Sequence, residues 1–100
     1  MEKRVCIIIP TYNNEGTLRR VITEVLRICP DLLVINDGST DSTESILESF
    51  SGLDYISYPE NKGKGYALRN GFARASELGY EYAVTLDSDG QHEPENIRDL

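Results

Sequence analysis

The sequence predicts a three-layer α/β fold with a mostly parallel sheet, in the order βαβαβαβ. Short, continuous apolar runs alternate with longer segments whose apolar residues recur every three or four positions. Helical crossovers between short buried strands make those strands parallel. The chain has 100 residues, 39% hydrophobic and 27% charged, which fits one soluble domain spanning residues 1–100.

The first strand is expected over residues 5–9, whose unbroken β-branched run indicates burial on both faces; Pro10 should end it. The helix that follows has an apolar stripe and should stop at Pro30. That stripe comprises Leu18, Val21, Ile22, Val25, Leu26 and Cys29. A second buried strand is expected over residues 32–35, ended by the polar residues 36–38.

In the second half, Asp41 should cap a second helix, with Glu44 as its reciprocal acid. Residues 55–58 predict a weaker third strand, and residues 82–86 a fourth. A third helix is expected over residues 63–78. Its inward face would be Ala67, Leu68, Gly71, Phe72, Ala75 and Leu78, and the inner face of the second helix would be Ile46, Leu47 and Phe50. Pro94 suits the first turn of a final helix.

Composition excludes several classes of function. With 10 Lys and Arg against 17 Asp and Glu, the net charge is −7, which argues against a nucleic-acid partner and a basic membrane-surface module. No apolar run approaches the roughly 20 residues of a transmembrane helix, and no signal peptide is recognisable, so we expect a cytoplasmic chain. Cys6 and Cys29 have no zinc spacing or disulfide framework and are expected to be small buried residues.

Polar clusters follow all four predicted strands, at residues 10–15, 36–39, 60–65 and 87–92. In an open parallel sheet, ligands bind at the carboxyl ends of the strands. The clusters should therefore meet at one rim.

The strongest chemical signal is Asp87 with Asp89, two residues apart after a strand. Side chains at such a spacing point the same way, and two adjacent carboxylates repel unless a cation lies beside them. Oxygen ligands of this kind suit Mg²⁺ or Mn²⁺. The alternative is a solvated turn in which Gly90 supplies a positive φ.

Other rim residues have two interpretations each. Asp37 could accept a hydrogen bond from a base, or belong to a plain Asp-Gly turn. The Lys-Gly-Lys-Gly run at residues 62–65 could attract an anion to a helix N-terminus, or form a solvated loop. His92 could bind a metal or lie in a turn, and Tyr12 could stack on a base or cover the rim.

The four clusters together resemble the family 2 glycosyltransferases, which have the GT-A fold, a Rossmann-like arrangement. The matching segments are VCIIIPTYNNE from Val5, VINDGSTD from Val34, NKGKGYALRNG from Asn61 and LDSDGQH from Leu86. They cover nearly the whole chain. The last segment looks most like the polyprenol-phosphate sugar transferases.

The resemblance implies a nucleotide-sugar site. Thr11, Tyr12 and Glu15 would hold the nucleoside, Asp37 the base, and Lys62 and Gly63 would lie along the nucleotide. Pro10 and Ser88 would complete that site. Asp87 would lie near the ribose and metal, Asp89 would bind the Mg²⁺ or Mn²⁺ on the diphosphate, and Gln91 would assist. The donor would be a UDP- or GDP-sugar.

Members of that family continue well past this length, with an acceptor site and a catalytic base that are missing here. Glu93 and Glu95 follow the metal motif too closely to replace the base. We therefore expect a truncated, nucleotide-sugar-binding half of an enzyme of cell-wall or glycan biosynthesis. The whole enzyme would pass sugar to a polyprenyl phosphate or a glycan hydroxyl, at the inner face of the membrane.

Two alternatives remain. The sequence Asp87-Ser88-Asp89-Gly90 also looks like the nucleophile motif of haloacid-dehalogenase-type phosphatases, with Asp87 attacking phosphate. That family usually places the motif on its first strand and follows it with Thr rather than Gln91. The other alternative is a non-catalytic binding fragment, whose open sheet edge would favour a homodimer.

Overall fold

A computed structural model describes residues 4–88 and 96–100. Its elements alternate as far as the fourth strand. They are β1 (Val5–Thr11), α1 (Glu15–Ile28), β2 (Leu32–Asp37), α2 (Thr43–Glu48), β3 (Asp54–Tyr58), α3 (Lys64–Glu77), β4 (Tyr82–Thr85) and β5 (Asn96–Asp99). The predicted alternation and the predicted α/β class are confirmed.

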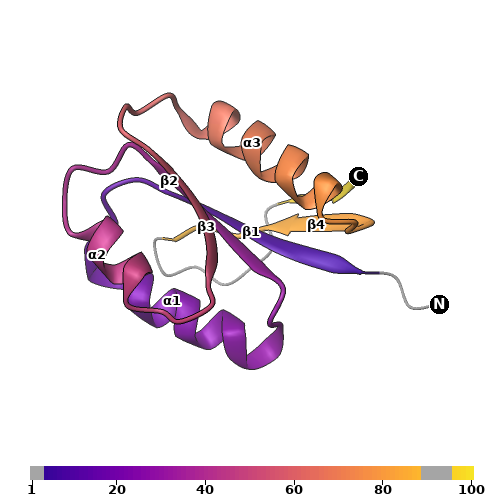
Figure 1. The fold of residues 1–100 in the computed structure, drawn as a ribbon, viewed down its shortest axis with the longest axis horizontal. Helices are drawn as coiled ribbons and strands as arrows, with labels where there is room; N and C mark the ends of the chain where they lie inside the picture. Colours follow the sequence, from indigo (N-terminus) through magenta and orange to yellow (C-terminus); the bar gives the residue numbers. More distant parts are fainter. Residues whose placement is uncertain (1–3, 89–95) are drawn as a thin grey trace.

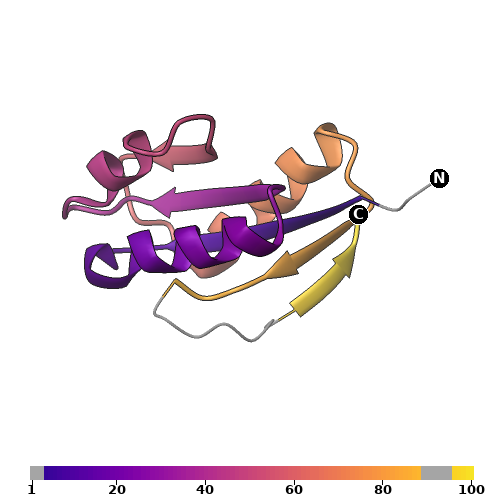
Figure 2. The same cartoon turned by 90° about the horizontal axis from the view of Figure 1, so that it is seen from below.

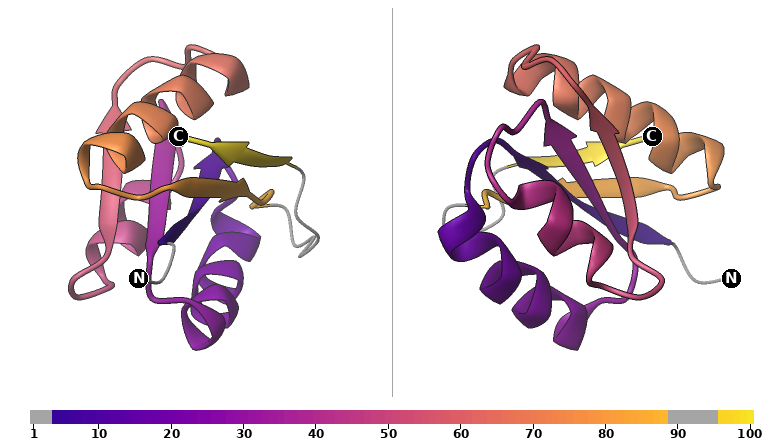
Figure 3. Two further views of the ribbon diagram at one scale, coloured as in Figure 1. Left: turned by 90° about the vertical axis from the view of Figure 1, so that its right-hand side faces the viewer. Right: turned by 60° about the vertical axis from the view of Figure 1, so that its left-hand side comes forward.

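The sheet has the strand order β3-β2-β1-β4-β5. The first four strands pair in parallel, and β5 pairs antiparallel to β4. Helices α1 and α2 cover one face of the sheet and α3 covers the other (Figures 1 and 3). The molecule is therefore a three-layer sandwich, as the sequence predicted.

Alternate residues of the strands supply two cores. Ile9 and Val34 pack with Leu18, Ile22 and the other buried residues of α1, and with Leu47 of α2. On the other face, Ile8 and Ile35 belong to a cluster with Ala67 and Ala75 of α3. The central strands are buried on both faces, which explains why they are continuously apolar.

Helix α3 lies close to the sheet because small residues recur every fourth position on its inner face. These residues are Ala67, Gly71 and Ala75, all buried. A Cβ on Gly71 would come within 2.8 Å of Ile8 Cγ2, so only glycine permits this approach. Leu78 was expected on this face, but α3 ends at Glu77 and Leu78 is 42% exposed.

The prediction that Pro10 ends the first strand was wrong, because β1 continues through Thr11. Pro10 pairs with Ile35 of β2, whereas the pairing of β1 with β4 ends at Ile8 and Thr85. Proline cannot donate a ladder hydrogen bond. The missing donor is tolerated because, at Pro10, β1 pairs with β2 but no longer with β4.

The prediction of a final helix after Pro94 was also wrong over residues 96–99, which form β5. This strand pairs Ile97 with Val84 and satisfies the outer backbone groups of β4 (Figure 2). The Arg98 guanidinium lies 4.9 Å from the centre of the Phe72 ring. In the described part of the chain, the outer strands are therefore β3 and β5, and pairing of either with a second copy stays a prediction.

The start of α2 differs from the predicted reciprocal cap. Asp41 accepts a hydrogen bond from the backbone of Thr43 at 2.9 Å. Glu44 instead accepts from Asn36 Nδ2 at 3.0 Å and from the hydroxyl of Ser57. Glu44 thus ties α2 to strands β2 and β3.

None of the helices within residues 4–88 and 96–100 is both long and apolar enough to cross a membrane.

Candidate functional site

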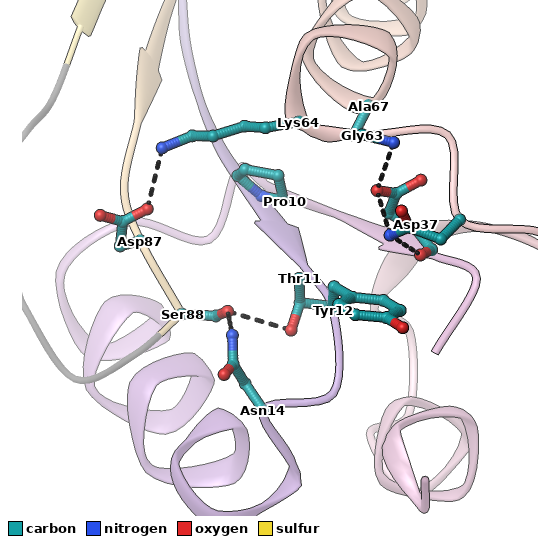
Figure 4. Close-up of a pocket in the computed structure, with 11 residues that line it drawn as sticks. Pro10, Thr11, Tyr12, Asn14, Asp37, Gly63, Lys64, Ala67, Asp87 and Ser88 are labelled. Atoms are coloured by element: carbon teal, nitrogen blue, oxygen red, sulfur yellow. Dashed lines mark hydrogen bonds and ion pairs between the residues drawn. The ribbon is translucent and has the colours of Figure 1, made fainter. Parts of the chain in front are cut away.

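A cavity of about 390 Å³ lies at the carboxyl ends of the strands, where the predicted clusters meet. It opens beside β1, which lies between β2 and β4. The helix before β2 (α1) and the helix before β4 (α3) cover opposite faces of the sheet, and a ligand crevice usually forms at such a position. Figure 4 shows its side chains converging from four segments of the chain. Its lining comprises Pro10, Thr11, Tyr12, Asn14, Asp37, Asn61, Gly63, Lys64, Ala67, Asp87 and Ser88.

Asp37 anchors one end of the cavity. Its carboxylate is buried and accepts hydrogen bonds from Asn61 Nδ2 at 2.9 Å, from Lys62 N at 2.8 Å and from Gly63 N at 3.0 Å. These bonds hold the loop that leads into α3. Asp37 is therefore more than a turn residue, because one carboxylate organises three consecutive residues of a neighbouring loop.

Gly38 lets this loop pass directly over the end of β2. Its φ is +67°, and a Cβ there would overlap the backbone of Glu60 and Asn61.

Tyr58, at the end of β3, is beside Asp37. Burial, and then the Asp37 carboxylate, raise the pKa of the Tyr58 phenol, and its buried hydroxyl has no hydrogen-bond partner among the described residues.

An ion pair forms the other end of the cavity. Lys64 Nζ lies 3.1 Å from Asp87 Oδ1, and the two side chains are 52% and 27% exposed. Lys64 is the first residue of α3, and Asp87 follows β4. The lysine chain extends across the cavity over Pro10 (Figure 4).

Ser88 connects three segments behind this ion pair. Its hydroxyl donates to Thr11 Oγ1 at 3.0 Å and accepts from Asn14 Nδ2 at 2.6 Å. Its carbonyl oxygen accepts from the Thr17 hydroxyl at 2.6 Å. Ser88 lines the cavity, but its hydroxyl is already engaged on both sides, so it mainly positions the chain around Asp87.

Glu15 makes its contacts with α2. Its Oε2 accepts from Ser42 N at 2.9 Å, and its own N–H donates to Asp41 Oδ2 at 3.2 Å. Asn13, at a φ of +51°, adds a bond from Thr40 N to its Oδ1 at 2.8 Å. These bonds fasten the loop that carries Tyr12 to the loop before α2.

The predicted site residues fall into three groups. Lining the cavity are Pro10, Thr11, Tyr12, Asp37, Gly63, Asp87 and Ser88. Glu15 and Lys62 are not among its lining residues; Lys62 contributes its backbone to Asp37 and pairs its Nζ with Glu60 at 3.2 Å. Asp89, Gln91, His92, Glu93 and Glu95 lie outside the described residues.

Four lining residues were not among the predicted nucleotide or metal ligands, namely Asn14, Asn61, Lys64 and Ala67. The first three belong to the predicted rim clusters, and Lys64 is in the same lysine-glycine run as Lys62. Which of the two lysines faces the cavity depends on where α3 begins. Ala67 is one helical turn after Gly63 and lies on the same face.

A divalent ion at Asp87 fits the donors that are described. In residues 4–88 and 96–100, no three His, Cys, Asp or Glu side chains gather into a metal cage. Mg²⁺ commonly binds through one or two carboxylates and completes its shell with substrate phosphates and water. A partly exposed carboxylate at the cavity suits that mode of binding.

Comparison with known proteins identifies the family. The model of the family described as "Glycosyl transferase family 2" matches residues 6–100. The chain belongs to glycosyl transferase family 2. This match includes every segment that forms the cavity.

Three relatives are about one third identical to this chain over the residues that align. It is 32% identical over 113 residues to a UDP-N-acetylglucosamine--dolichyl-phosphate N-acetylglucosaminyltransferase of Methanococcus voltae, covering 96% of this chain and 45% of that protein. It is 33% identical over 105 residues to a polyprenol monophosphomannose synthase of Mycolicibacterium smegmatis, covering 98% and 40%. An undecaprenyl-phosphate mannosyltransferase of Micrococcus luteus is 34% identical over 100 residues, covering 94% and 41%. The chain thus spans less than half the length of these relatives.

Proposed function

We propose that this chain is the donor-binding part of a metal-dependent glycosyltransferase. The donor would be a UDP- or GDP-sugar, and the whole enzyme would pass the sugar to a lipid phosphate of the polyprenyl type, at the membrane surface. The observation that carries the proposal is the cavity itself, which has a buried carboxylate at one end and an ion pair at the other. The choice of acceptor is supported by the names of three relatives, which mention dolichyl phosphate, polyprenol and undecaprenyl phosphate.

The base would lie at the end formed by Asp37 and Tyr12. A carboxylate has about four acceptor positions, and Asp37 uses three of them on its loop. The remaining position can accept one N–H from the edge of a base. The Tyr12 ring is 46% exposed at the rim and can stack on the flat face of that base.

The diphosphate would lie between the start of α3 and Asp87. The positive end of the α3 dipole and the Lys64 ammonium attract phosphate oxygens. Asp87, with Asp89, would hold a Mg²⁺ or Mn²⁺ ion, which when bound supplies Lewis-acid stabilisation of the departing diphosphate. The chain's own groups would bind and orient the donor.

Thermal melting with a panel of nucleotides tests this proposal. A nucleoside diphosphate should stabilise the chain only when Mn²⁺ or Mg²⁺ is present. At one hundred times Kd, the stabilisation should be about 2.7 kcal/mol, roughly 10 to 20 °C in Tm for a domain of this size. The absence of any shift with UDP, GDP or their sugars, for a folded chain with Mn²⁺, would contradict the proposal.

The family assignment argues against the phosphatase alternative for Asp87. A non-catalytic fragment remains compatible with donor binding, because binding requires only the cavity. A sugar-transfer assay with polyprenyl phosphate, using this chain and a full-length family 2 enzyme as reference, separates binding from turnover.

A further inference from the structure

We propose that Lys64 is a counter-ion for Asp87. It weakens binding of a divalent ion that arrives without nucleotide, and it moves to the diphosphate when nucleotide and ion enter together. This inference rests on the proposed donor site. It goes further by assigning a role to a lysine and an order to binding, so that the ion and the nucleotide enter as one complex.

The position of the pair supports this role. Lys64 begins α3, Asp87 follows β4, and both residues line the cavity. Their 3.1 Å contact therefore lies at one end of the space that a ligand would occupy, rather than on an outer surface. A ligand that reaches Asp87 must share it with the lysine or displace the lysine.

Charge explains why a lone ion is disfavoured. The Asp87 carboxylate already has a cation beside it, and a divalent ion in the same place would be repelled by the Lys64 ammonium. The lysine is half exposed on a flexible four-carbon chain, so it can swing away at the small cost of a partly exposed ion pair. The penalty on binding of a lone ion is thus modest, about two- to five-fold.

A diphosphate changes this balance. Its oxygens offer Lys64 a new anionic partner at the start of α3, while the metal ion takes over Asp87. The lysine then exchanges its contact with Asp87 for a contact with the diphosphate. The ion and the diphosphate should consequently strengthen each other's binding, and Lys64 should contribute to that coupling.

A comparison of variants with one matched control tests the inference. Lys64→Met removes the charge, and Lys64→Arg keeps it. Arg74→Met is the control, because it removes a positive charge from the same helix. Arg74 Nη2 lies 3.5 Å from Asp54 Oδ1, and neither residue lines the cavity. Circular dichroism and melting establish that each variant folds. Binding of Mn²⁺ alone is followed by the electron paramagnetic resonance signal of the unbound ion, and binding of UDP and GDP by calorimetry at saturating Mn²⁺.

We expect Lys64→Met to bind Mn²⁺ alone two- to five-fold more tightly than the unmodified chain. The same variant should bind the preferred nucleotide about tenfold more weakly with Mn²⁺ present. The factor by which nucleotide tightens Mn²⁺ binding should fall at least twofold. Lys64→Arg and Arg74→Met should remain within twofold of the unmodified chain in all three quantities.

Two results would overturn the inference and leave the proposed function intact. One is unchanged Mn²⁺ affinity in Lys64→Met while nucleotide binding is lost, which would make Lys64 a simple phosphate ligand. The other is a set of unchanged constants throughout. If the unmodified chain binds neither UDP nor GDP with Mn²⁺, the proposed function fails, and the inference fails with it.

Discussion

The hydroxyl of Ser88 donates a hydrogen bond to the hydroxyl of Thr11 over 3.0 Å, joining the carboxyl ends of β4 and β1 inside the fold. Since Asn14 donates to the same serine oxygen, one small side chain fixes the position of Asp87 relative to α1. This relationship, and three others, lead to specific predictions.

Ser88→Ala should destabilise the chain, because Thr11 and Asn14 would lose a buried partner. We expect the free energy of unfolding in urea to fall by about 1 to 3 kcal/mol. Ser76→Ala, on the exposed side of α3, is the matched control and should change it by about 0.5 kcal/mol or less. Equal effects at the two positions would show that the Ser88 bonds contribute nothing.

Gly38→Ala should be much more damaging than Gly52→Ala. Both glycines have positive φ values, +67° and +79°, so both variants carry backbone strain of about 1 to 2 kcal/mol. A Cβ at Gly52 meets nothing within 4 Å, whereas at Gly38 it overlaps the backbone of the crossing loop. Urea unfolding should show a further loss of about 1 to 3 kcal/mol for Gly38→Ala. Similar losses would mean that the loop can move aside.

Asp37→Asn should loosen the loop before α3. An amide in place of the carboxylate points an N–H group at one of its present donors, Gly63 N or Lys62 N. Hydrogen exchange of the amides of Lys62 and Gly63 should accelerate, and stability should fall by about 1 to 3 kcal/mol. Asp54→Asn, which changes a partly exposed acid on β3, should leave the exchange of both amides as it is.

Stability should decline in alkali because of Cys6. Burial, and then the nearby Asp31 carboxylate, raise the pKa of its thiol from 9.0 to about 12. Above pH 9 the unfolded chain releases this proton while the folded chain keeps it, so the stabilisation is complete below pH 9 and is lost as pH rises toward 12. Unfolding in urea between pH 8 and pH 11 measures the slope.

Cys6→Val, a change of similar volume, should reduce that slope without abolishing it. A smaller slope remains because burial and hydrogen bonding to Asp31 raise the pKa of the Tyr80 phenol to about 12 as well. Identical slopes for Cys6→Val and the unmodified chain would contradict the assignment to Cys6.

The order of strands and helices up to β4 could be predicted because each element has a local signature. The stripe of α1 places Leu18, Val21 and Ile22 inside, and they are buried. β5 could not be predicted, because residues 96–99 have no period of their own and become a strand only by pairing with β4. The continuation of β1 through Pro10 likewise depends on where its pairing with β4 ends.

The site was predictable in its location and less so in its details. Topology alone places the four clusters at one rim, and the cavity lies there. Which residues of a cluster face the cavity depends on contacts between segments that are distant in the sequence. Glu15 contacts the loop before α2, and Lys64 rather than Lys62 reaches Asp87. No local sequence pattern distinguishes those lysines.

The proline within β1 has a consequence for how durable the cavity is. Leu86 N donates to Ile8 O at 3.0 Å just after β4, but Pro10 has no N–H with which to donate the next hydrogen bond. The ladder between these segments therefore lacks one donor at the edge of the cavity. This gap is set by the covalent structure of proline, so substitutions of the other cavity-lining residues leave it in place.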